Sequence, residues 1–126
     1  MNESPEININ SNCLIPENYL PDINVRLLMY NKISLAETNN DLKNIQIEMI
    51  NRFGLLPDEL VNFFLQAELR ILSEQCSVKK INFLKNKVSI SFKNKDLDTS
   101  FFNDDKLDEK VKATSDVIRA ITNNVS

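Results

Sequence analysis

The sequence is short of the residues on which most enzyme chemistry depends. Its 126 residues include no histidine, no tryptophan, one glycine and two cysteines. Without histidine there is no Ser-His or Cys-His nucleophile pair and no imidazole ligand for a metal ion. The single glycine, Gly54, excludes a phosphate-binding loop, which needs several positions without a Cβ atom. Cys13 and Cys76 are too few for a zinc site with four ligands, so we predict neither catalysis nor a bound cofactor or metal ion.

The remaining composition is that of a folded domain. Hydrophobic residues make up 42% of the chain and the net charge is −3, which predicts one soluble domain over residues 1–126 without a structural disulfide. Residues 1–5 are expected to be disordered. No apolar run reaches the ~20 residues that span a bilayer, and the first residues lack the basic and apolar regions of a signal peptide. We therefore predict a cytoplasmic protein with reduced thiols and no membrane partner.

The helical part of the chain begins after two prolines. A short alternating segment at residues 6–10 is typical of an edge strand. Asp22 then follows Pro21 and is a good N-cap for a helix that extends to about Thr38. Apolar residues occur around the whole circumference of this helix, which predicts burial on several sides. We expect it to be the central helix of the domain.

Two further helices are predicted in the middle of the chain. The first ends near Phe53 and has one apolar stripe at helical spacing, made of Leu42, Ile45, Met49 and Phe53. Gly54 follows at the position of a left-handed closing residue. Pro57 and Asp58 suit the first turn of the next helix. That helix extends to about Cys76 and has apolar residues on two sides.

Beyond residue 76 the apolar spacing changes to that of strands. Apolar and polar residues alternate in residues 78–83 and 88–92, on either side of a turn at 85–87, which predicts a β-hairpin with one buried face. Residues 93–103 are mostly polar, and no strand is predicted there. A last helix with a narrow apolar stripe is expected over residues 104–123. The predicted fold is α+β: a helical cluster packed with a small antiparallel β-sheet or hairpin and a C-terminal helix.

Two charged clusters have both a functional and a structural interpretation. Acids at positions 104, 105, 108 and 109 could bind a hard cation, but acids also stabilise the first turn of a helix, and we prefer that interpretation. Lysines crowd the hairpin around Phe83 and Phe92, as in sheets that bind single-stranded nucleic acid. The alternation places both phenylalanines on the buried face, and lysines also protect edge strands from aggregation, so nucleic-acid binding is the less favoured hypothesis. The lysines are Lys79, Lys80, Lys85, Lys87, Lys93 and Lys95.

Two segments carry a resemblance to a known family. Residues 14–27 read LIPENYLPDINVRL and residues 51–59 read NRFGLLPDE. These motifs and the spacing between them are similar to those of the C-terminal domain of bacterial transcription-repair coupling factor. The resemblance extends over residues 6–92, whereas residues 93–126 diverge from the family pattern.

The resemblance implies a regulatory function. In that family the parent protein is an ATP-dependent DNA translocase that removes stalled RNA polymerase and recruits the repair protein UvrA. Its C-terminal domain is not catalytic: it packs against the N-terminal UvrB-like module of the same protein, covers the UvrA-binding surface and restrains the motor. UvrA and RNA polymerase are then indirect partners. The alternatives are a nucleic-acid-binding module that uses the lysine-rich hairpin and a passive structural cap.

The resemblance also points to candidate docking residues. Glu48 matches a helix glutamate that is a candidate for an interdomain salt bridge to an arginine of the UvrB-like module, and Ile47 lies beside it off the apolar stripe. The alternative for Glu48 is a pair with Arg52, four residues later on the same helix, which contributes roughly 0.2–0.5 kcal/mol.

Two arginines are expected to be structural. Arg26 and Arg52 each stand in a motif with a Pro-Asp pair, which contains Asp22 in one case and Asp58 in the other. A guanidinium group that bridges a helix end to a carboxylate would fix the packing of the helices. We therefore expect both arginines, together with Gly54, to hold the fold and not to contact a partner.

Overall fold

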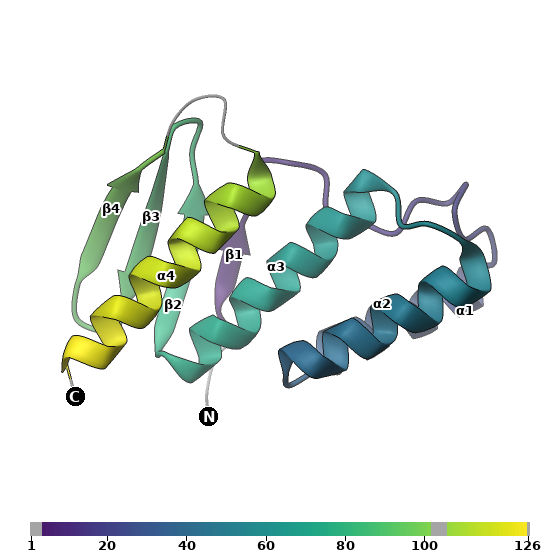
Figure 1. Cartoon of the computed structure of the whole chain (residues 1–126), viewed down its shortest axis with the longest axis horizontal. Coiled ribbons are helices and arrows are strands. Elements are labelled where there is room, and N and C mark those ends of the chain that lie inside the picture. The colour runs from purple at the N-terminus through teal and green to yellow at the C-terminus, as the bar shows by residue number, and fades with distance from the viewer. Residues whose placement is uncertain (1–3, 102–105, 126) are drawn as a thin grey trace. The chain divides into compact units, whose positions relative to one another are not determined.

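The computed structural model describes residues 4–101 and 106–125 and has the predicted α+β fold (Figure 1). The chain divides into two compact units: residues 11–71, which we call the helical unit, and the residues before 11 and after 71, which we call the sheet unit. That residues 1–126 act as one domain stays a prediction. Of residues 1–5, which are expected to be disordered, residues 1–3 lie outside the described residues. In chain order the elements are β1 (Glu6–Asn8), α1 (Ile23–Leu35), α2 (Asn39–Phe53), α3 (Asp58–Gln75), β2 (Val78–Phe83), β3 (Lys87–Phe92), β4 (Asp96–Ser100) and α4 (Leu107–Val125).

The helical unit starts with an irregular segment that is fastened to its helices. Ile15 and Leu20 are each 3% exposed and anchor this segment in the core. The backbone N–H of Ile15 donates a hydrogen bond to the Tyr30 hydroxyl of α1 at 2.8 Å. The backbone N–H of Leu14 donates to the Glu59 carbonyl of α3 at 3.1 Å. These two backbone N–H groups are therefore satisfied where the segment lies against the helices.

Tyr19 joins the two motif segments. Its ring packs edge-on against Phe53, with ring centroids 6.1 Å apart. Its hydroxyl lies 2.8 Å from the Gly54 carbonyl oxygen and 3.3 Å from that of Met49. A hydroxyl has one proton to donate, so the shorter contact is the stronger hydrogen bond. Partial burial raises the pKa of the Tyr19 phenol.

α2 and α3 follow the predicted pattern. α2 begins with a capping box between Thr38 and Asp41, which satisfies backbone N–H groups at the helix start. Its predicted apolar stripe faces the core, and Gly54 ends the helix with a positive φ of 101°. The buried residues of this core are Ile15, Leu20, Met29, Ile33, Ala36, Leu42, Met49, Leu60, Phe64, Ala67 and Ile71.

α1 differs from its prediction as a central helix. It is capped by Asp22 as expected, but it ends at Leu35, and its buried residues are Met29 and Ile33. Four large apolar side chains of α1 are between 51% and 74% exposed: Ile23, Leu27, Leu28 and Leu35. The prediction was wrong because apolar residues around a helix indicate surfaces suited to burial, and only one of those surfaces packs into this core.

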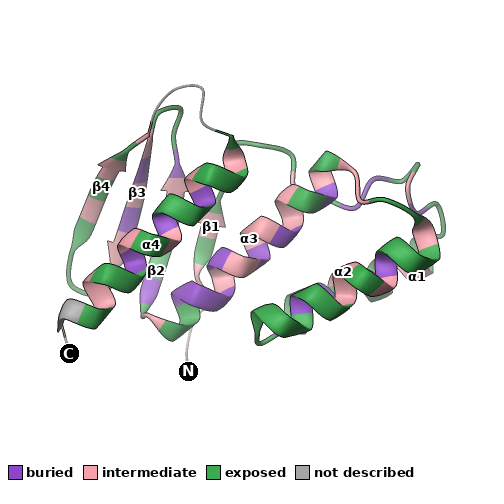
Figure 2. Ribbon diagram, viewed as in Figure 1, coloured by how far each residue is buried: buried purple, intermediate pink, exposed green. Residues whose placement is uncertain are grey.

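The sheet unit is built on four strands in the order β1-β2-β3-β4. β2 and β3 form the predicted hairpin, with Ile81 opposite Ile90 and Phe83 opposite Val88. These four side chains are at most 4% exposed, so this part of the face is buried as predicted, whereas Phe92 at its end is only partly buried. Among the strands, Figure 2 shows buried residues on β2 and β3, while β4 is exposed or intermediate.

Two features of the sheet differ from the prediction. β1 pairs parallel to β2, so the sheet is mixed and not antiparallel. Three helices connect these two strands, and a parallel pair requires such a long crossover. β4 is a strand that the sequence prediction omits; it pairs antiparallel to β3. Asp96 and Asp98 make this segment polar, which is typical of an edge strand and conceals its alternation.

α4 packs on the sheet through its predicted stripe. Val111, Thr114 and Ile118 are at most 3% exposed, and the Thr114 hydroxyl donates to the backbone carbonyl of Lys110 at 2.8 Å. The Lys110 ammonium group donates to the Lys85 carbonyl in the hairpin turn at 3.2 Å. Within the sheet unit, α4 therefore lies against the hairpin (Figure 1). The predicted helix start at residue 104 lies outside the described residues.

Gly54→Ala is expected to lower the free energy of unfolding of the helical unit by about 1–3 kcal/mol, because only glycine adopts this backbone conformation without strain. An added Cβ atom meets no heavy atom within 4 Å, so the effect is a backbone effect. Both tyrosines of the chain lie in the helical unit, so urea unfolding followed by tyrosine fluorescence measures it. Asn51→Ala, at an exposed position of α2, is the control and should change stability by less than about 0.5 kcal/mol. Equal urea midpoints for Gly54→Ala and Asn51→Ala would contradict the predicted backbone strain at residue 54.

Candidate functional site

The Glu48 carboxylate lies between two cations on the surface of the helical unit. Its Oε1 atom accepts a hydrogen bond from the Lys32 ammonium group of α1 at 3.0 Å. Its Oε2 atom accepts one from the Arg52 guanidinium group at 2.8 Å. The Glu48 side chain is 31% exposed, while those of Lys32 and Arg52 are 42% and 46% exposed. The pair with Arg52, predicted as the alternative to docking, is therefore present, and a second pair joins α2 to α1.

The two cations lower the pKa of Glu48. The hydrogen bond from Lys32 is the largest cause, followed by that from Arg52, while partial burial acts in the opposite direction. Solvent screens such exposed pairs, so each contributes about 1 kcal/mol at most. Two cations and one anion give the cluster a net charge of +1. An ionised carboxylate has about four acceptor sites, so Glu48 retains capacity for a further donor.

Exposed apolar side chains flank this ion cluster. Leu28 and Leu35 lie four residues before and three residues after Lys32, on the same face of α1, and are 51% and 74% exposed. Ile47, beside Glu48 on α2, is 48% exposed. An exposed apolar patch bordered by polar groups can mark a surface that binds another protein. We call this set the candidate docking surface; its residues are Leu28, Lys32, Leu35, Ile47, Glu48 and Arg52.

Asp22 and Arg26, two of the residues predicted to hold the fold, both stabilise the start of α1. Asp22 is confirmed as the N-cap of α1, accepting hydrogen bonds from two backbone N–H groups of the first turn at 2.9 and 3.2 Å. Arg26 donates to the carbonyl oxygens of the two residues before Asp22, at 2.9 and 3.3 Å. It thus holds the loop before α1 to the helix, but through carbonyl groups and not through the expected carboxylate.

The Arg52 side chain is 46% exposed, in contrast to the prediction that its guanidinium group fixes the packing of the helices. Its carboxylate partner is Glu48 on its own helix, and its guanidinium carbon lies 4.8 Å from the centre of the Phe53 ring. Asp58 is the exposed first residue of α3, where an acid interacts favourably with the helix dipole. Arg52 therefore belongs with the candidate docking surface.

Residues 9–101 match the model of the family described as the TRCF domain. The chain belongs to the TRCF domain family. Proteins named transcription-repair-coupling factor are similar to it: 39% identical over 80 residues in Haemophilus influenzae, 35% over 79 in Escherichia coli and 34% over 92 in Borreliella burgdorferi. These alignments cover 63–73% of the chain but 7–8% of the relatives, so the TRCF domain spans a small part of their length.

A solved structure has a similar fold. The crystal structure described as the C-terminal domain of transcription-repair coupling factor superposes on this TRCF domain with a TM-score of 0.68 and 22% identity. The likeness covers 72% of this chain and 56% of that one, and at this identity it concerns the fold alone. The family match ends at residue 101, so α4 of the TRCF domain lies beyond it.

The hairpin lysines and the acidic cluster are the other charged groups for which the sequence suggested a function. Two hairpin lysines face carboxylates: Lys80 pairs with Glu6 at 3.2 Å, and Lys87 with Asp98 at 3.8 Å. Within residues 4–101 and 106–125 there is no group of three or more cysteine and acidic side chains arranged to hold a metal ion. Residues 104 and 105 of the predicted acidic cluster lie outside these ranges. The cysteine thiols are free, and no helix in the described part of the chain is long and apolar enough to cross a membrane.

Three residues of the candidate docking surface are not among the residues predicted for docking: Leu28, Lys32 and Leu35. The ion pair between Lys32 and Glu48 joins positions 16 residues apart on different helices, and no local spacing rule predicts it. Leu28 and Leu35 were expected in the core. The one usable signal is the excess of apolar residues around α1, since a short helix rarely packs on every side.

Lys32→Met and Arg52→Met are each expected to raise the pKa of Glu48, with Lys32→Met having the larger effect, because each removes a hydrogen-bond donor. NMR titration of the side-chain carboxyl carbon measures this shift. The lowered pKa means that the cluster stabilises the fold above the ordinary glutamate pKa of about 4.3 and loses this contribution as the pH falls through the folded value. Lys43→Met, at an exposed position of α2, should leave the titration unchanged. An unchanged pKa in Lys32→Met would rule out the contact between the helices.

Proposed function

We propose that this TRCF domain is a non-catalytic regulatory domain of a cytoplasmic transcription-repair coupling factor. It docks on the N-terminal UvrB-like module of the same protein, masks the UvrA-binding surface of that module and restrains an ATP-dependent DNA-translocating motor. Family membership supports the setting in which the domain acts. The observation that carries the docking role is the ion cluster around Glu48, flanked by exposed leucine and isoleucine side chains.

The ion cluster suits a contact that must form and release. An arginine of the UvrB-like module can share the Glu48 carboxylate or replace one of its present partners. Each exposed pair that is lost costs about 1 kcal/mol at most, so the exchange is close to balanced. Covering Leu28 and Leu35 contributes about 25 cal/mol for each Å² of apolar surface buried. The apolar groups therefore supply most of the affinity, and Glu48 supplies orientation.

The lysine-rich hairpin gives weaker support for nucleic-acid binding. Lys80 and Lys87 are partly neutralised by Glu6 and Asp98. Phe83 is buried and cannot stack on a base, which leaves only the partly buried Phe92 of the two predicted aromatic side chains. A gel-shift experiment with the 126-residue chain at low salt separates the two functions. Binding that weakens steeply with added salt would favour the nucleic-acid function, because phosphate contacts release counterions.

Glu48→Arg in the full-length parent protein is expected to weaken docking by about 1–2 kcal/mol, or roughly tenfold, because it removes the acceptor and brings three cations together. UvrA binding and basal ATP hydrolysis should both increase. Glu17→Arg makes the same charge change at an exposed position of the helical unit outside the candidate docking surface and should leave both quantities unchanged.

Two further outcomes decide between docking and a passive cap. A pulldown of the UvrB-like module by the 126-residue chain should weaken with Glu48→Arg and with the double change Leu28→Ser and Leu35→Ser. If deletion of the whole domain leaves UvrA binding and ATP hydrolysis at the wild-type level, the domain is a passive cap and the docking function is wrong.

A further inference from the structure

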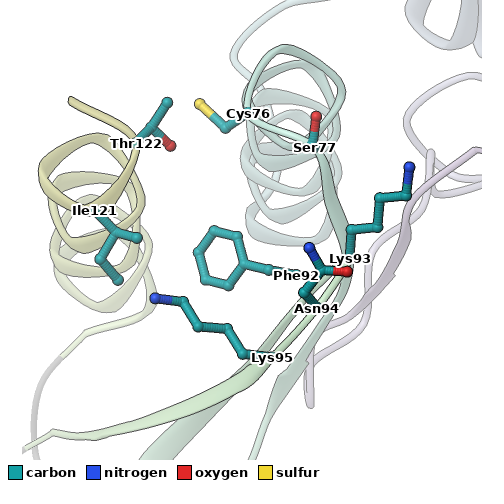
Figure 3. Close-up of a pocket in the computed structure, with 8 residues that line it drawn as sticks. All are labelled: Cys76, Ser77, Phe92, Lys93, Asn94, Lys95, Ile121 and Thr122. Carbon is teal, nitrogen blue, oxygen red and sulfur yellow. The ribbon is translucent and has the colours of Figure 1, made fainter. Parts of the chain in front are cut away.

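The sheet unit contains a pocket of about 530 Å³ beside α4 (Figure 3). Three segments form its wall: residues 76–77 between α3 and β2, residues 92–95 at the turn from β3 to β4, and residues 121–122 of α4. All three belong to the sheet unit. A volume of this size is within the range of sites that hold small ligands.

The base of the pocket is apolar. Figure 3 shows the Phe92 ring between Cys76 and Ile121. Phe92 ends the apolar side of β3, and Ile121 lies near the end of the α4 stripe; both are only partly buried. An apolar group that covers them would remove this surface from water, which is favourable.

The rim of the pocket is basic. Lys93 and Lys95 are the only charged residues of its lining, and within the described residues neither ammonium group forms an ion pair. The turn that carries them is closed by a hydrogen bond of 2.8 Å from the Phe92 N–H to the Lys95 carbonyl. Ser77, which precedes the strand paired with Phe92, has a φ of 58°, a left-handed conformation that is uncommon for a residue other than glycine. Both connections are thus held in defined conformations.

We propose that this pocket binds an apolar group joined to a carboxylate. The apolar group covers Phe92 and Ile121, and the carboxylate pairs with Lys95 and Lys93. Two lysines beside a mainly apolar surface suit a ligand that has an anionic group and an apolar group together. A free aliphatic carboxylic acid and the C-terminal residue of a peptide both have this chemistry.

This binding function goes beyond the docking function proposed above. The pocket and the candidate docking surface share no residue, so either function can fail without the other. One wall of the pocket comes from α4, beyond the residues 9–101 that match the TRCF family model.

The free thiol of Cys76 can report whether the pocket is occupied. Cys76 lines the pocket, whereas Cys13 lies in the helical unit, and both thiols are free. Alkylation of the 126-residue chain by iodoacetamide, followed by mass spectrometry of each cysteine-containing peptide, measures the two rates separately. Sodium octanoate at ten times its Kd should slow alkylation of Cys76 about tenfold and leave Cys13 unchanged. 1-Octanol at the same concentration, with equal chain length and no charge, should give little protection.

The peptide source is tested with Gly-Gly-Leu as the free acid and as the C-terminal amide. Protection of Cys76 by octanoate, by the free-acid peptide or by both supports the proposal and shows which source binds. The double change Lys93→Gln and Lys95→Gln should raise the concentration needed about tenfold, as expected for two exposed charge pairs. Lys85→Gln, at an exposed position in the β2–β3 turn, should have no effect. The proposal fails if neither carboxylate protects Cys76, if the uncharged partners protect equally, or if the double variant behaves as wild type.

Discussion

The hydroxyl group of Tyr19 donates a hydrogen bond to the Gly54 carbonyl oxygen at 2.8 Å, and its ring packs against Phe53. This contact brings together residues 14–27 and 51–59, the two segments that carry the family resemblance. Within the first segment, Arg26 binds the start of α1 to the loop before it, and the second segment contains the end of α2. With these ends held, α1 and α2 pack against each other and the pair between Lys32 and Glu48 can form. The geometry of the candidate docking surface therefore depends on a joint that is not part of it.

The energetics of that surface divide between two kinds of group. Full burial of a leucine side chain contributes about 1.5–3 kcal/mol, whereas an exposed ion pair contributes about 1 kcal/mol at most. In the proposed docked state, Leu28 and Leu35 therefore determine how tightly the domain binds. Glu48 determines which partner is accepted, because a carboxylate that faces the wrong charge is costly. Lys32 and Arg52 keep Glu48 ionised and paired in the undocked domain. The stability of the undocked domain therefore does not depend on a partner that pairs with Glu48.

Local signals account for what the sequence could predict of this fold. The N-cap Asp22, the closing residue Gly54, the stripe of α2 and the alternation of β2 and β3 all depend on neighbours within a few positions. The failures depend on distant partners. The apolar residues of α1 do not reveal which of them pack, and β4 is recognised as a strand only through its register with β3. The same holds at the site: the pair of Glu48 with Arg52 follows from helical spacing, but the pair with Lys32 does not.

The pocket of the sheet unit arises where two apolar patterns end. The stripe of α4 packs through Val111, Thr114 and Ile118 and then continues to Ile121, which is only partly buried. The apolar side of β3 likewise ends at Phe92, where the chain turns through residues 93–95. The last apolar residue of each element, Ile121 on α4 and Phe92 on β3, is therefore only partly covered. Lysines at such a margin keep their stems on apolar surface and their ammonium groups in water, which leaves a pocket that an anion with an apolar chain can fill.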